Sequence, residues 1–578
     1  MINKMTRYDF LLLSEDCDAF LAGLQDLGIV DITRSEKPVD ETSSAMFAKV
    51  EEMKKRISWL SAKDWSKDEQ YSGIQAELAS AAAERAEKAP WGRFDKDTIK
   101  ALEESGHKVR FYSVAKKKFD PAWAELQPLE IISDNGTTVW FVTVGDVESY
   151  EFPIAECKTP EASFEETDAR IATLDTQLKE RAEALEAEAL KVDSLSADQA
   201  KAVADLDLYL AGASKTVAAE EYVTVFTGFA PAEEDSRLKD AFDAMSCYWT
   251  SSKATAADLP PIKFKNNWFV KMFEPLTDMY GRPAYDGFDP TPYISIFFLL
   301  FFAMCMGDAG YGLLLIIVGL LLKKVKSFAS LAPLVVTLGI GTTVVGFFFH
   351  TFFSMDISQW ECIPDGLKQI MVPSQVANYD GTMVLALVIG IIHLCLAMTV
   401  KVIYAIKNNG FVNSLGVLGW TLLLVGGTIV GTLALIGVLD SALTKTIIII
   451  LGCVSAVGIF LLNDVHRNPL INIGSGLWEA YNTATGVLGD VLSYLRLYAL
   501  GLAGGMLGFA FNDLAKMALG DGGFGWIPFI LIVIIGHTLN LAMAALGAFV
   551  HPLRLNFLEF FKNSGYEGSG RKFDPLKK

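Results

Sequence analysis

The sequence predicts a chain of two unlike halves: an acidic half of α/β lobes and long helices, then an α-helical polytopic membrane domain. Two observations carry this prediction. The 578 residues are 51% apolar yet have a formal net charge of −18, and the charges concentrate before about Pro290. After that point come apolar runs of about 18 or more residues, enough to cross about 30 Å of hydrocarbon. We therefore expect two domains, residues 1–290 and residues 291–578.

The first half is predicted to contain two small α/β lobes. Residues 6–33 follow the periods of a strand, a helix and a second strand. Two further strand-rich segments lie at residues 108–149 and 221–229, and a helix-like stretch at residues 236–242 follows the second. We therefore expect one lobe at each end of the intervening helical region.

Two long charged helices are expected between the lobes. In the first, apolar residues recur at alternating spacings of four and three: Met46, Val50, Met53, Ile57 and Leu60. In the second, one heptad seam runs from Ile171 to Val192, interrupted by Arg181 and Glu188. Because a strand-rich segment separates the two helices, the sequence favours an antiparallel coiled-coil hairpin that serves as a strut. Two unconnected surface helices are the alternative.

The acidic half lacks the signatures of several functional classes. Its start has no long apolar core of a secretory signal, so we expect this half in the cytoplasm. There is no GxxxxGK[ST] motif and no GxGxxG after a strand, so we expect no nucleotide site and no cofactor. The seven cysteines show no metal-ligand spacing, which predicts reduced thiols and no metal site. Without a basic patch, nucleic acid is not an expected partner, and the acidic surface favours protein partners.

The second half is expected to cross the membrane about eight times. Its first apolar block, residues 293–322, is interrupted by GDAGYG at residues 307–312 and makes two short helices if the chain reverses there. The last two segments, roughly residues 476–516 and 525–561, are long. A helix of about 40 residues reaches about 60 Å, so these two must tilt or bend. The remaining spans are residues 328–353, 382–406, 411–439 and 447–462.

The positive charges indicate an orientation for this domain. With a cytoplasmic N-terminus and eight crossings, the C-terminus is cytoplasmic too. The inside segments then hold most of the cations: Lys323, Lys324, Lys326, Lys401, Lys407, Arg467, Lys562, Arg571, Lys572, Lys577 and Lys578. The outside loops contain mainly Lys368, Lys445 and Lys516, as the positive-inside rule requires. If GDAGYG did not reverse the chain, every later assignment would invert and contradict this bias.

Two arginines stand out within the apolar segments. Arg496 lies inside the run from Val491 to Phe511, and a guanidinium placed there costs several kcal/mol and cannot shed its charge. Arg554 ends the last apolar stretch, with His551 three residues earlier on the same helical face. The alternative for each arginine is a side chain that reaches the membrane interface or neutralises a nearby carboxylate. That alternative is weaker for Arg496, because long apolar flanks lie on both sides.

Both arginines belong to stripes of small residues that allow another helix to approach closely. The first stripe contains Ser493 beside Arg496, and the second contains Asn540, His551 and Arg554. Static helix packing is the ordinary explanation. A permanent cation can also favour the ionised form of a carboxylate that slides past it on a moving partner, and so expel the proton or sodium ion bound there. Pro552 adds a local irregularity beside His551.

Several motifs in one order resemble a known family: PPIKFKN (260–266), FEPLTDMYGRPAYDGFDPTP (273–292), FFAMCMGDAGYG (301–312), GDVLSYLRLYALGLA (489–503) and HPLRLNFLEFF (551–561). The chain is similar to the membrane stator subunit of rotary vacuolar/archaeal-type ATPases, called subunit a or subunit I. The motifs cover the membrane half well, whereas the N-terminal half matches in architecture more than in motif.

The resemblance implies a role without a catalytic site in this chain. It places Arg496 and Arg554 against a rotor ring of proteolipid subunits that carry ion-binding glutamates. Two offset half-channels would connect the ring to opposite sides of the bilayer, and an ATPase head with its rotor adaptor would turn the ring. The N-terminal strut would bind peripheral stalks and resist torque. A multi-pass protein of a prokaryotic plasma membrane is expected.

Further half-channel candidates follow from the same resemblance. Asp308 matches a family acid near the outer half-channel, although a plain helix cap is an equal alternative. Glu479 is a candidate for the inner channel, with interfacial solvation as the alternative. His537 and Asn540 are lesser candidates, because helix-to-helix hydrogen bonds are the more common role. The sequence departs from eukaryotic members at Asn482 and Ala544, where those members carry acids, so the resemblance leaves the channel path open.

A self-contained secondary ion transporter with a cytoplasmic regulatory domain is the rival class. It would need a substrate site at the bilayer midplane and repeated halves, and no internal repeat is found. A purely structural scaffold is a third reading, and it predicts that Arg496 tolerates replacement. The sequence leaves open the choice between proton and sodium, the direction of turnover and the number of stalks.

Overall fold

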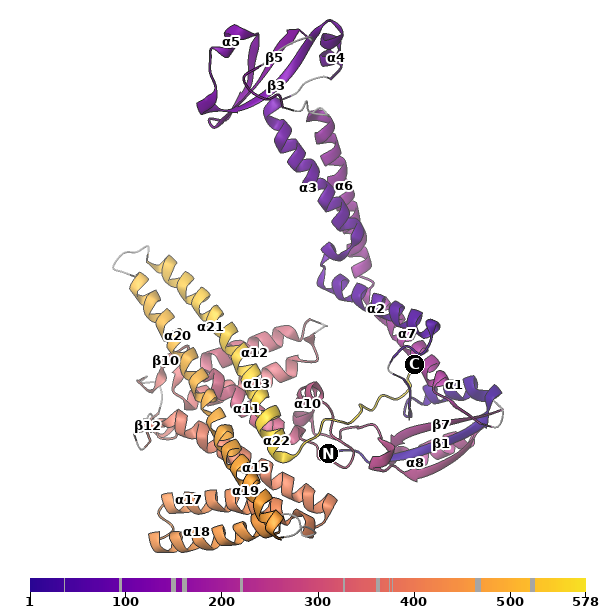
Figure 1. Ribbon diagram of the computed structural model, residues 1–578, viewed down its shortest axis with the longest axis vertical. Helices are drawn as coiled ribbons and strands as arrows, with labels where there is room; N and C mark the ends of the chain where they lie inside the picture. Colours follow the sequence, from indigo (N-terminus) through magenta and orange to yellow (C-terminus); the bar gives the residue numbers. More distant parts are fainter. Residues whose placement is uncertain are drawn as a thin grey trace. The chain divides into compact units, whose positions relative to one another are not determined.

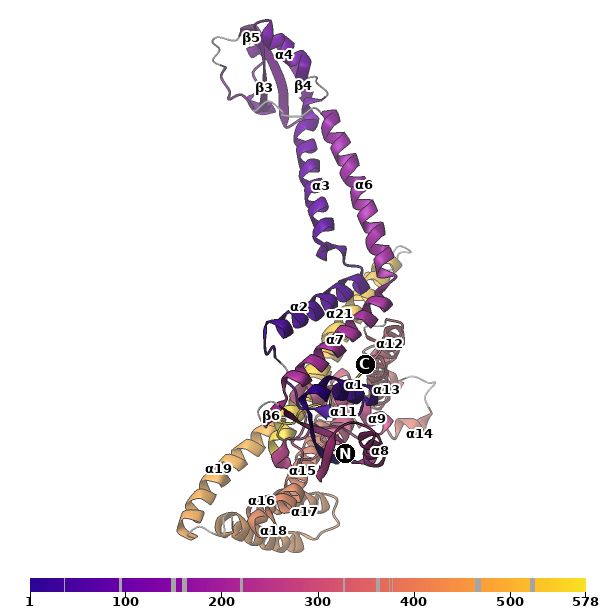
Figure 2. The same cartoon turned by 90° about the vertical axis from the view of Figure 1, so that its right-hand side faces the viewer.

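The computed structural model describes residues 1–35, 37–92, 96–146, 152–157, 164–218, 222–325, 328–359, 364–373, 375–376, 378–462, 469–519 and 525–578. The chain forms two compact units. One comprises Met1–Thr33 and Thr216–Pro575, and the other comprises Arg34–Lys215 with Leu576–Lys578. Figures 1 and 2 show the elements of both units from two directions.

The first unit contains an α/β lobe with a five-stranded sheet. Strand β1 (Met5–Leu13), helix α1 (Cys17–Leu27) and strand β2 (Asp31–Ile32) confirm the predicted strand–helix–strand order. The sheet order is β2-β7-β1-β8, with β6 (Thr216–Ala218) also paired to β7 (Val223–Pro231). Helix α8 (Asp235–Asp243) and strand β8 (Tyr248–Lys253) follow β7, so segments more than 200 residues apart complete one fold.

A buried tyrosine links this sheet to α8. The Tyr8 hydroxyl donates to Asp235 Oδ1 at 2.8 Å, and the Thr6 hydroxyl donates to Asp235 Oδ2 at 2.9 Å. Burial raises the pKa of Tyr8, so this hydroxyl keeps its proton and remains a donor. The ring packs edge-on against Phe242, which anchors α8 on the sheet.

The C-terminal segment of this unit returns to the same lobe. Residue Ile262 forms a parallel bridge with Lys572, and its amide donates to the Arg571 carbonyl at 2.7 Å. Arg571 Nη2 donates to Asp31 Oδ1 at 3.2 Å, and the Asp574 amide donates to Asp31 Oδ2 at 2.9 Å. Because Asp31 is fully buried, these bonds compensate part of the cost of removing a carboxylate from water.

The second unit consists of four long helices and a small sheet. Helix α2 (Glu41–Ala62) packs along α7 (Val192–Ala213), and α3 (Glu69–Lys88) packs along α6 (Phe164–Ala189). The three-stranded sheet has the order β3-β5-β4, from β3 (His107–Ala115), β4 (Leu129–Asp134) and β5 (Thr138–Asp146), with α4 (Lys96–Glu104) and α5 (Trp123–Leu126) beside it. Figures 1 and 2 both show α3 and α6 side by side.

Ion pairs account for the two polar interruptions of the predicted heptad seam. Arg181 Nε and Nη2 donate to Asp68 Oδ1 and Oδ2 at 3.1 and 2.8 Å, and Glu188 pairs with Arg56 at 2.5 Å. Asp68 also caps α3 by accepting from the Tyr71 amide at 2.8 Å. The pairs run in opposite sequence directions, so the helices are antiparallel, while a true coiled coil remains a prediction.

The membrane half contains five helical segments that are long and apolar enough to span a bilayer, counted over the described residues: Gly381–Asn408, Val412–Ala434, Ser441–Leu461, Ile471–Leu519 and Trp526–Ser564. Three shorter apolar helices precede them, α11 (Thr291–Met306), α12 (Ala309–Leu322) and α13 (Ala332–Phe348). At about 1.5 Å per residue each is shorter than about 30 Å of hydrocarbon. The prediction that GDAGYG interrupts the first block is confirmed, but the count of eight spans is not.

The remaining spans follow their predicted order. Helix α15 (Gly381–Asn409) is followed by α16 (Leu415–Thr421), the π-helical η10 (Leu422–Gly426) and α17 (Gly427–Leu435). Helix α18 (Ser441–Ala456) continues into the π-helical η11 (Val457–Leu461). Two of the cations used to predict the orientation, Lys326 and Arg467, lie outside the described residues.

The two long C-terminal segments are not uniform helices. The first consists of α19 (Pro469–Ser493) and α20 (Leu495–Leu519), separated at Tyr494. The second consists of α21 (Trp526–Arg554), the π-helical η12 (Leu555–Phe560) and α22 (Phe561–Ser564). Tyr494 is fully buried, and its hydroxyl lies 2.9 Å from His393 Nδ1 on α15. A Cβ at Gly390 would lie 2.4 Å from the Tyr494 ring, so only glycine permits this close approach.

Candidate functional site

Arg496 lies two residues after the break in the long segment, near the start of α20. Its side chain is partly buried, and its Nη1 is buried without a hydrogen-bond partner in the part of the chain that the structure describes. A guanidinium has five donors and cannot lose its charge, so a buried and unpaired nitrogen is costly. Within the described residues neither Arg496 nor Arg554 forms an ion pair. The guanidinium of Arg496 therefore keeps donors that no carboxylate of the described residues uses.

Three ionisable groups surround Arg496 within electrostatic range. Cys305 of α11 is buried, His551 of α21 is half-buried, and Glu559 of η12 is only 4% exposed. These residues come from three segments, and α11, α20 and α21 pack together in one apolar core. The cation therefore sits where three helical segments converge.

Glu559 is the site residue that the sequence prediction missed. Its carboxyl is buried, Oε2 has no hydrogen-bond partner among the described residues, and Ser493 is a near neighbour. The π-helical segment that carries Glu559 begins three residues after Pro552, consistent with the expected local irregularity. The sequence did contain a signal for Glu559, an acid within an apolar stretch five residues after Arg554. An ionisable residue in a membrane segment is a functional candidate by default.

His551 and Arg554 were expected on one helical face. Both lie in the last turn of α21, and His551 is in electrostatic range of both arginines. Arg554 itself is exposed, whereas His551 Nδ1 is buried and has no hydrogen-bond partner among the residues described. Arg554 is therefore accessible to a neighbouring molecule at this face.

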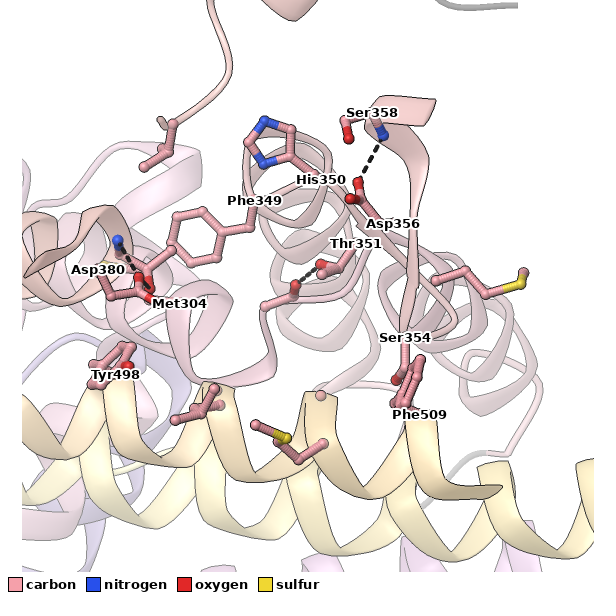
Figure 3. Close-up of a pocket in the computed structure, with 18 of the residues that line it drawn as sticks. Met304, Phe349, His350, Thr351, Ser354, Asp356, Ser358, Asp380, Tyr498 and Phe509 are labelled. Atoms are coloured by element: carbon pink, nitrogen blue, oxygen red, sulfur yellow. Dashed lines mark hydrogen bonds between the residues drawn. The ribbon is translucent and has the colours of Figure 1, made fainter. Parts of the chain in front are cut away.

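A second cluster surrounds a cavity of about 730 Å³ beside α20 (Figure 3). Its walls come from the end of α11, from a hairpin of β9 (Thr351–Phe352) and β10 (Met355–Asp356), and from α20. Polar groups lining it include Thr351, Ser354, Asp356, Ser358, Asp380, Tyr498, Asn512 and Lys516. In Figure 3 Asp380 lies near Tyr498 on one side, and Asp356 lies near Ser358 on another. Two carboxylates in a partly apolar cavity can attract cations.

A buried hydrogen-bonded chain connects this cavity with α21. Asn540 Nδ2 donates to the Tyr311 hydroxyl at 2.8 Å, and that hydroxyl lies 2.7 Å from His537 Nδ1. His537 Nε2 lies 2.9 Å from Asn512 Oδ1, and Asn512 Nδ2 donates to the Phe353 carbonyl at 2.8 Å. Because Asn512 Oδ1 can only accept, His537 carries its proton on Nε2, and Nδ1 accepts from Tyr311. All five members have partners in this arrangement.

The structure brings some predicted candidates together and separates others. His537 and Asn540 meet at Tyr311, near Asp308, which is 4% exposed and caps α12. Ser493 lies beside the Arg496 cluster and donates to the Gly489 carbonyl at 3.1 Å. Glu479 lies apart on the exposed face of α19. No group of three metal-ligating side chains occurs among the residues that the structure describes.

Comparison with known proteins supports the predicted resemblance. Residues 143–333 match the model of the V-type ATPase 116kDa subunit family. The chain is 32% identical over 386 residues to the A-type ATP synthase subunit I of Methanocaldococcus jannaschii, covering 60% of this chain and 54% of that protein. It is 25% identical over 507 residues to the V-type ATP synthase subunit I of Borreliella burgdorferi, covering 84% and 82%.

The likenesses cover different shares of the relatives. The chain spans about half the length of the archaeal relatives from Methanocaldococcus jannaschii and Pyrococcus horikoshii. A crystal structure of the cytoplasmic N-terminal domain of subunit I, a homologue of V-ATPase subunit a, covers 43% of this chain at 13% identity. Its TM-score of 0.17 gives no support to a shared fold.

Proposed function

We propose that this chain, a relative of the subunit I proteins of A-type and V-type ATP synthases, is the membrane stator subunit of a rotary ATPase. The observation that carries the proposal is the unpaired, permanent cation at Arg496 among small residues. ATP hydrolysis or synthesis takes place on other subunits, and this chain contributes the stationary side of the ion path.

The proposed mechanism needs one charge that never changes. A carboxylate on a rotor proteolipid would bind an ion while it faces lipid or a half-channel. When it reaches Arg496, the guanidinium favours the ionised carboxylate, so the ion leaves. The Arg496 side chain is partly exposed, so its guanidinium would be within reach of that carboxylate. Arg554 is exposed at the C-terminal end of α21. It would contact the next carboxylate of the ring or block the leakage of ions back across the membrane.

Two regions are suited to the half-channels. The cavity beside α20, with Asp356 and Asp380 on its walls, would connect the ring to the outer side. The buried Glu559 with Ser493, on the other side of Arg496 along the helix, would serve the cytoplasmic path, with Glu479 further along α19. His551, His537 and Asn540 would line or support these paths. An ion that must pass the ring to change channels cannot leak directly.

The soluble residues would form the arm of the stator. We propose that residues 1–290 lie in the cytoplasm and that residues 291–578 form the ion-translocating domain. The paired helices of the second unit, tied by Arg181–Asp68 and Arg56–Glu188, suit a strut that links the membrane domain to peripheral stalks and the ATPase head. The rotor adaptor would turn beside it. The plasma membrane of a prokaryote is the proposed location.

The test uses the assembled complex in liposomes. With Arg496→Ala, ATP-driven ion uptake should fall by at least tenfold while the complex still co-purifies with the ring and the head. Full-rate uptake by that variant would refute the proposal. Varying sodium, with and without a protonophore, identifies the ion. A stand-alone secondary transporter would instead transport ions as a purified single chain.

A further inference from the structure

The hairpin in the cavity wall has an unfavourable turn. Phe353 and Ser354 form the two-residue loop between β9 and β10, and their φ angles are +47° and +57°. Turns with positive φ at both central residues normally contain asparagine, aspartate or glycine, because a Cβ is disfavoured in this conformation. Neither residue is of those types. Something else must hold this loop in place.

Asp308 accepts hydrogen bonds from both turn residues. Its Oδ1 accepts from the Phe353 amide at 2.9 Å, and its Oδ2 accepts from the Ser354 amide at 2.5 Å. The same Oδ1 caps α12, because it also accepts from the amides of Gly310 at 2.8 Å and Tyr311 at 3.1 Å. One carboxylate thus joins the start of a helix to a turn 45 residues later.

These four bonds leave Asp308 little capacity for a passing ion. An ionised carboxylate offers about four accepting positions, two on each oxygen. Three of the amides bond to Oδ1 and one to Oδ2, so only Oδ2 has an accepting position left. The side chain is 4% exposed, and Asp308 is not among the residues lining the cavity, whereas Ser354 and Asp356 of the held hairpin are. The geometry therefore separates the acid from the path that its neighbours line.

We infer that Asp308 is a positioning residue that holds the glycine-free turn at Phe353–Ser354 and thereby fixes the cavity wall. The inference rests on the proposed function only for the role of the cavity as a half-channel. The anchoring itself is independent of transport. Asp308 acts through the hairpin, and the ion meets Asp356 and Asp380 instead.

Hydrogen exchange in the assembled protein tests the anchor. The reporter is the Ile357 amide, which closes the hairpin by donating to the His350 carbonyl at 2.8 Å and does not contact Asp308. In Asp308→Asn, the new amide group cannot accept from Ser354, so exchange at Ile357 should accelerate at least tenfold. Asp513→Asn, at an exposed acid of α20, is the control and should leave it unchanged.

A second substitution separates anchoring from ion transfer. Ser354→Gly removes the conformational cost at φ +57° and should restore most of the protection lost in Asp308→Asn. Alone, Ser354→Gly should slow exchange at Ile357, so this arm remains informative even if Asp308→Asn fails to assemble. Protection that is unchanged in Asp308→Asn, or not restored by the glycine, would overturn the inference.

Transport kinetics give an independent readout. A displaced wall hinders entry, so Asp308→Asn should raise the KM for the outside ion in ATP synthesis with kcat largely retained, and Ser354→Gly should lower that KM again. A loss of kcat at saturating ion that the glycine does not relieve would identify Asp308 as an ion carrier. If the wild-type complex transports no ion, the proposed function fails while the exchange result stands.

Discussion

The ion pair between Arg181 and Asp68 should stabilise the junction of α3 and α6. The two side chains are 31% and 12% exposed, and two charge-assisted bonds join them. Such bonds contribute about 1.5–3 kcal/mol when buried, and exposed pairs contribute about 1 kcal/mol or less. Discounted for the exposure of Arg181, the expected contribution is about 1.5 kcal/mol. Arg181→Leu should therefore speed local opening about tenfold, since 1.4 kcal/mol is a factor of ten.

A double-mutant cycle isolates that contribution. Hydrogen exchange of amides in the first turns of α3 would be measured for Arg181→Leu, Asp68→Asn and the double variant. Asparagine still caps the Tyr71 amide, so the cycle reports the ion pair and not the cap. Lys63→Ala, in an exposed pair with Glu186, is the control and should change little. A coupling energy below about 0.3 kcal/mol would refute the reasoning.

The pH dependence gives the same pair a second signature. The hydrogen bonds from Arg181 lower the pKa of Asp68 below its ordinary value. A carboxyl whose pKa is lower in the folded state stabilises the fold above the unfolded pKa of about 3.9, and loses that contribution as the pH falls through the folded pKa. The difference in the free energy of local opening between wild type and Arg181→Leu should thus be constant from about pH 5 to 8. It should vanish on further acidification. A difference that grows on acidification would contradict this assignment.

Two further substitutions test the membrane domain. Glu559→Gln keeps the shape of the side chain but removes a buried titratable carboxyl group near Arg496. It should lower ATP-driven ion uptake into liposomes several-fold with assembly intact, and unchanged uptake would exclude Glu559 from the path. Gly346→Ala places a Cβ 2.2 Å from the Ala309 amide nitrogen and should destabilise the domain by about 1–3 kcal/mol, seen as a lower thermal midpoint. Gly427→Ala, where nothing lies within 4 Å, is its control, and equal midpoints for the two variants would refute the packing argument.

The sequence was informative where one residue type has few structural alternatives. The interruption at GDAGYG was predictable because Gly307 adopts φ +56° and Asp308 then caps a new helix. The periodic segments of the first half predicted β1, α1, α2 and most of α6, whereas the long helices α3 and α7 were not among the two expected. The polar interruptions of the heptad seam, Arg181 and Glu188, had no visible explanation until their partners on α2 and at the start of α3 were known.

The features that could not be predicted depend on contacts between distant segments. Tyr494 interrupts the long helix although no glycine or proline is present there, because its ring packs against Gly390 and its hydroxyl meets His393. Glu559 is 63 residues from Arg496 in the sequence, and only the packing of α20 against the end of α21 brings the two within electrostatic range. The turn at Phe353–Ser354 lacks the residue types that signal such a turn in a sequence. The hydrogen bonds that hold it come from Asp308, 45 residues earlier in the chain.

The closure of the first lobe by the C-terminal segment has a consequence for biosynthesis. Asp31 receives hydrogen bonds from residues 540 and 543 positions later in the chain. A ribosome adding about 5–20 residues per second needs roughly half a minute or more to supply them. During that interval the nascent lobe carries a carboxylate that still lacks two of its final donors, so the last strand contact can form only after the apolar segments have been made. Completion of this lobe would therefore report that synthesis of the membrane domain has finished.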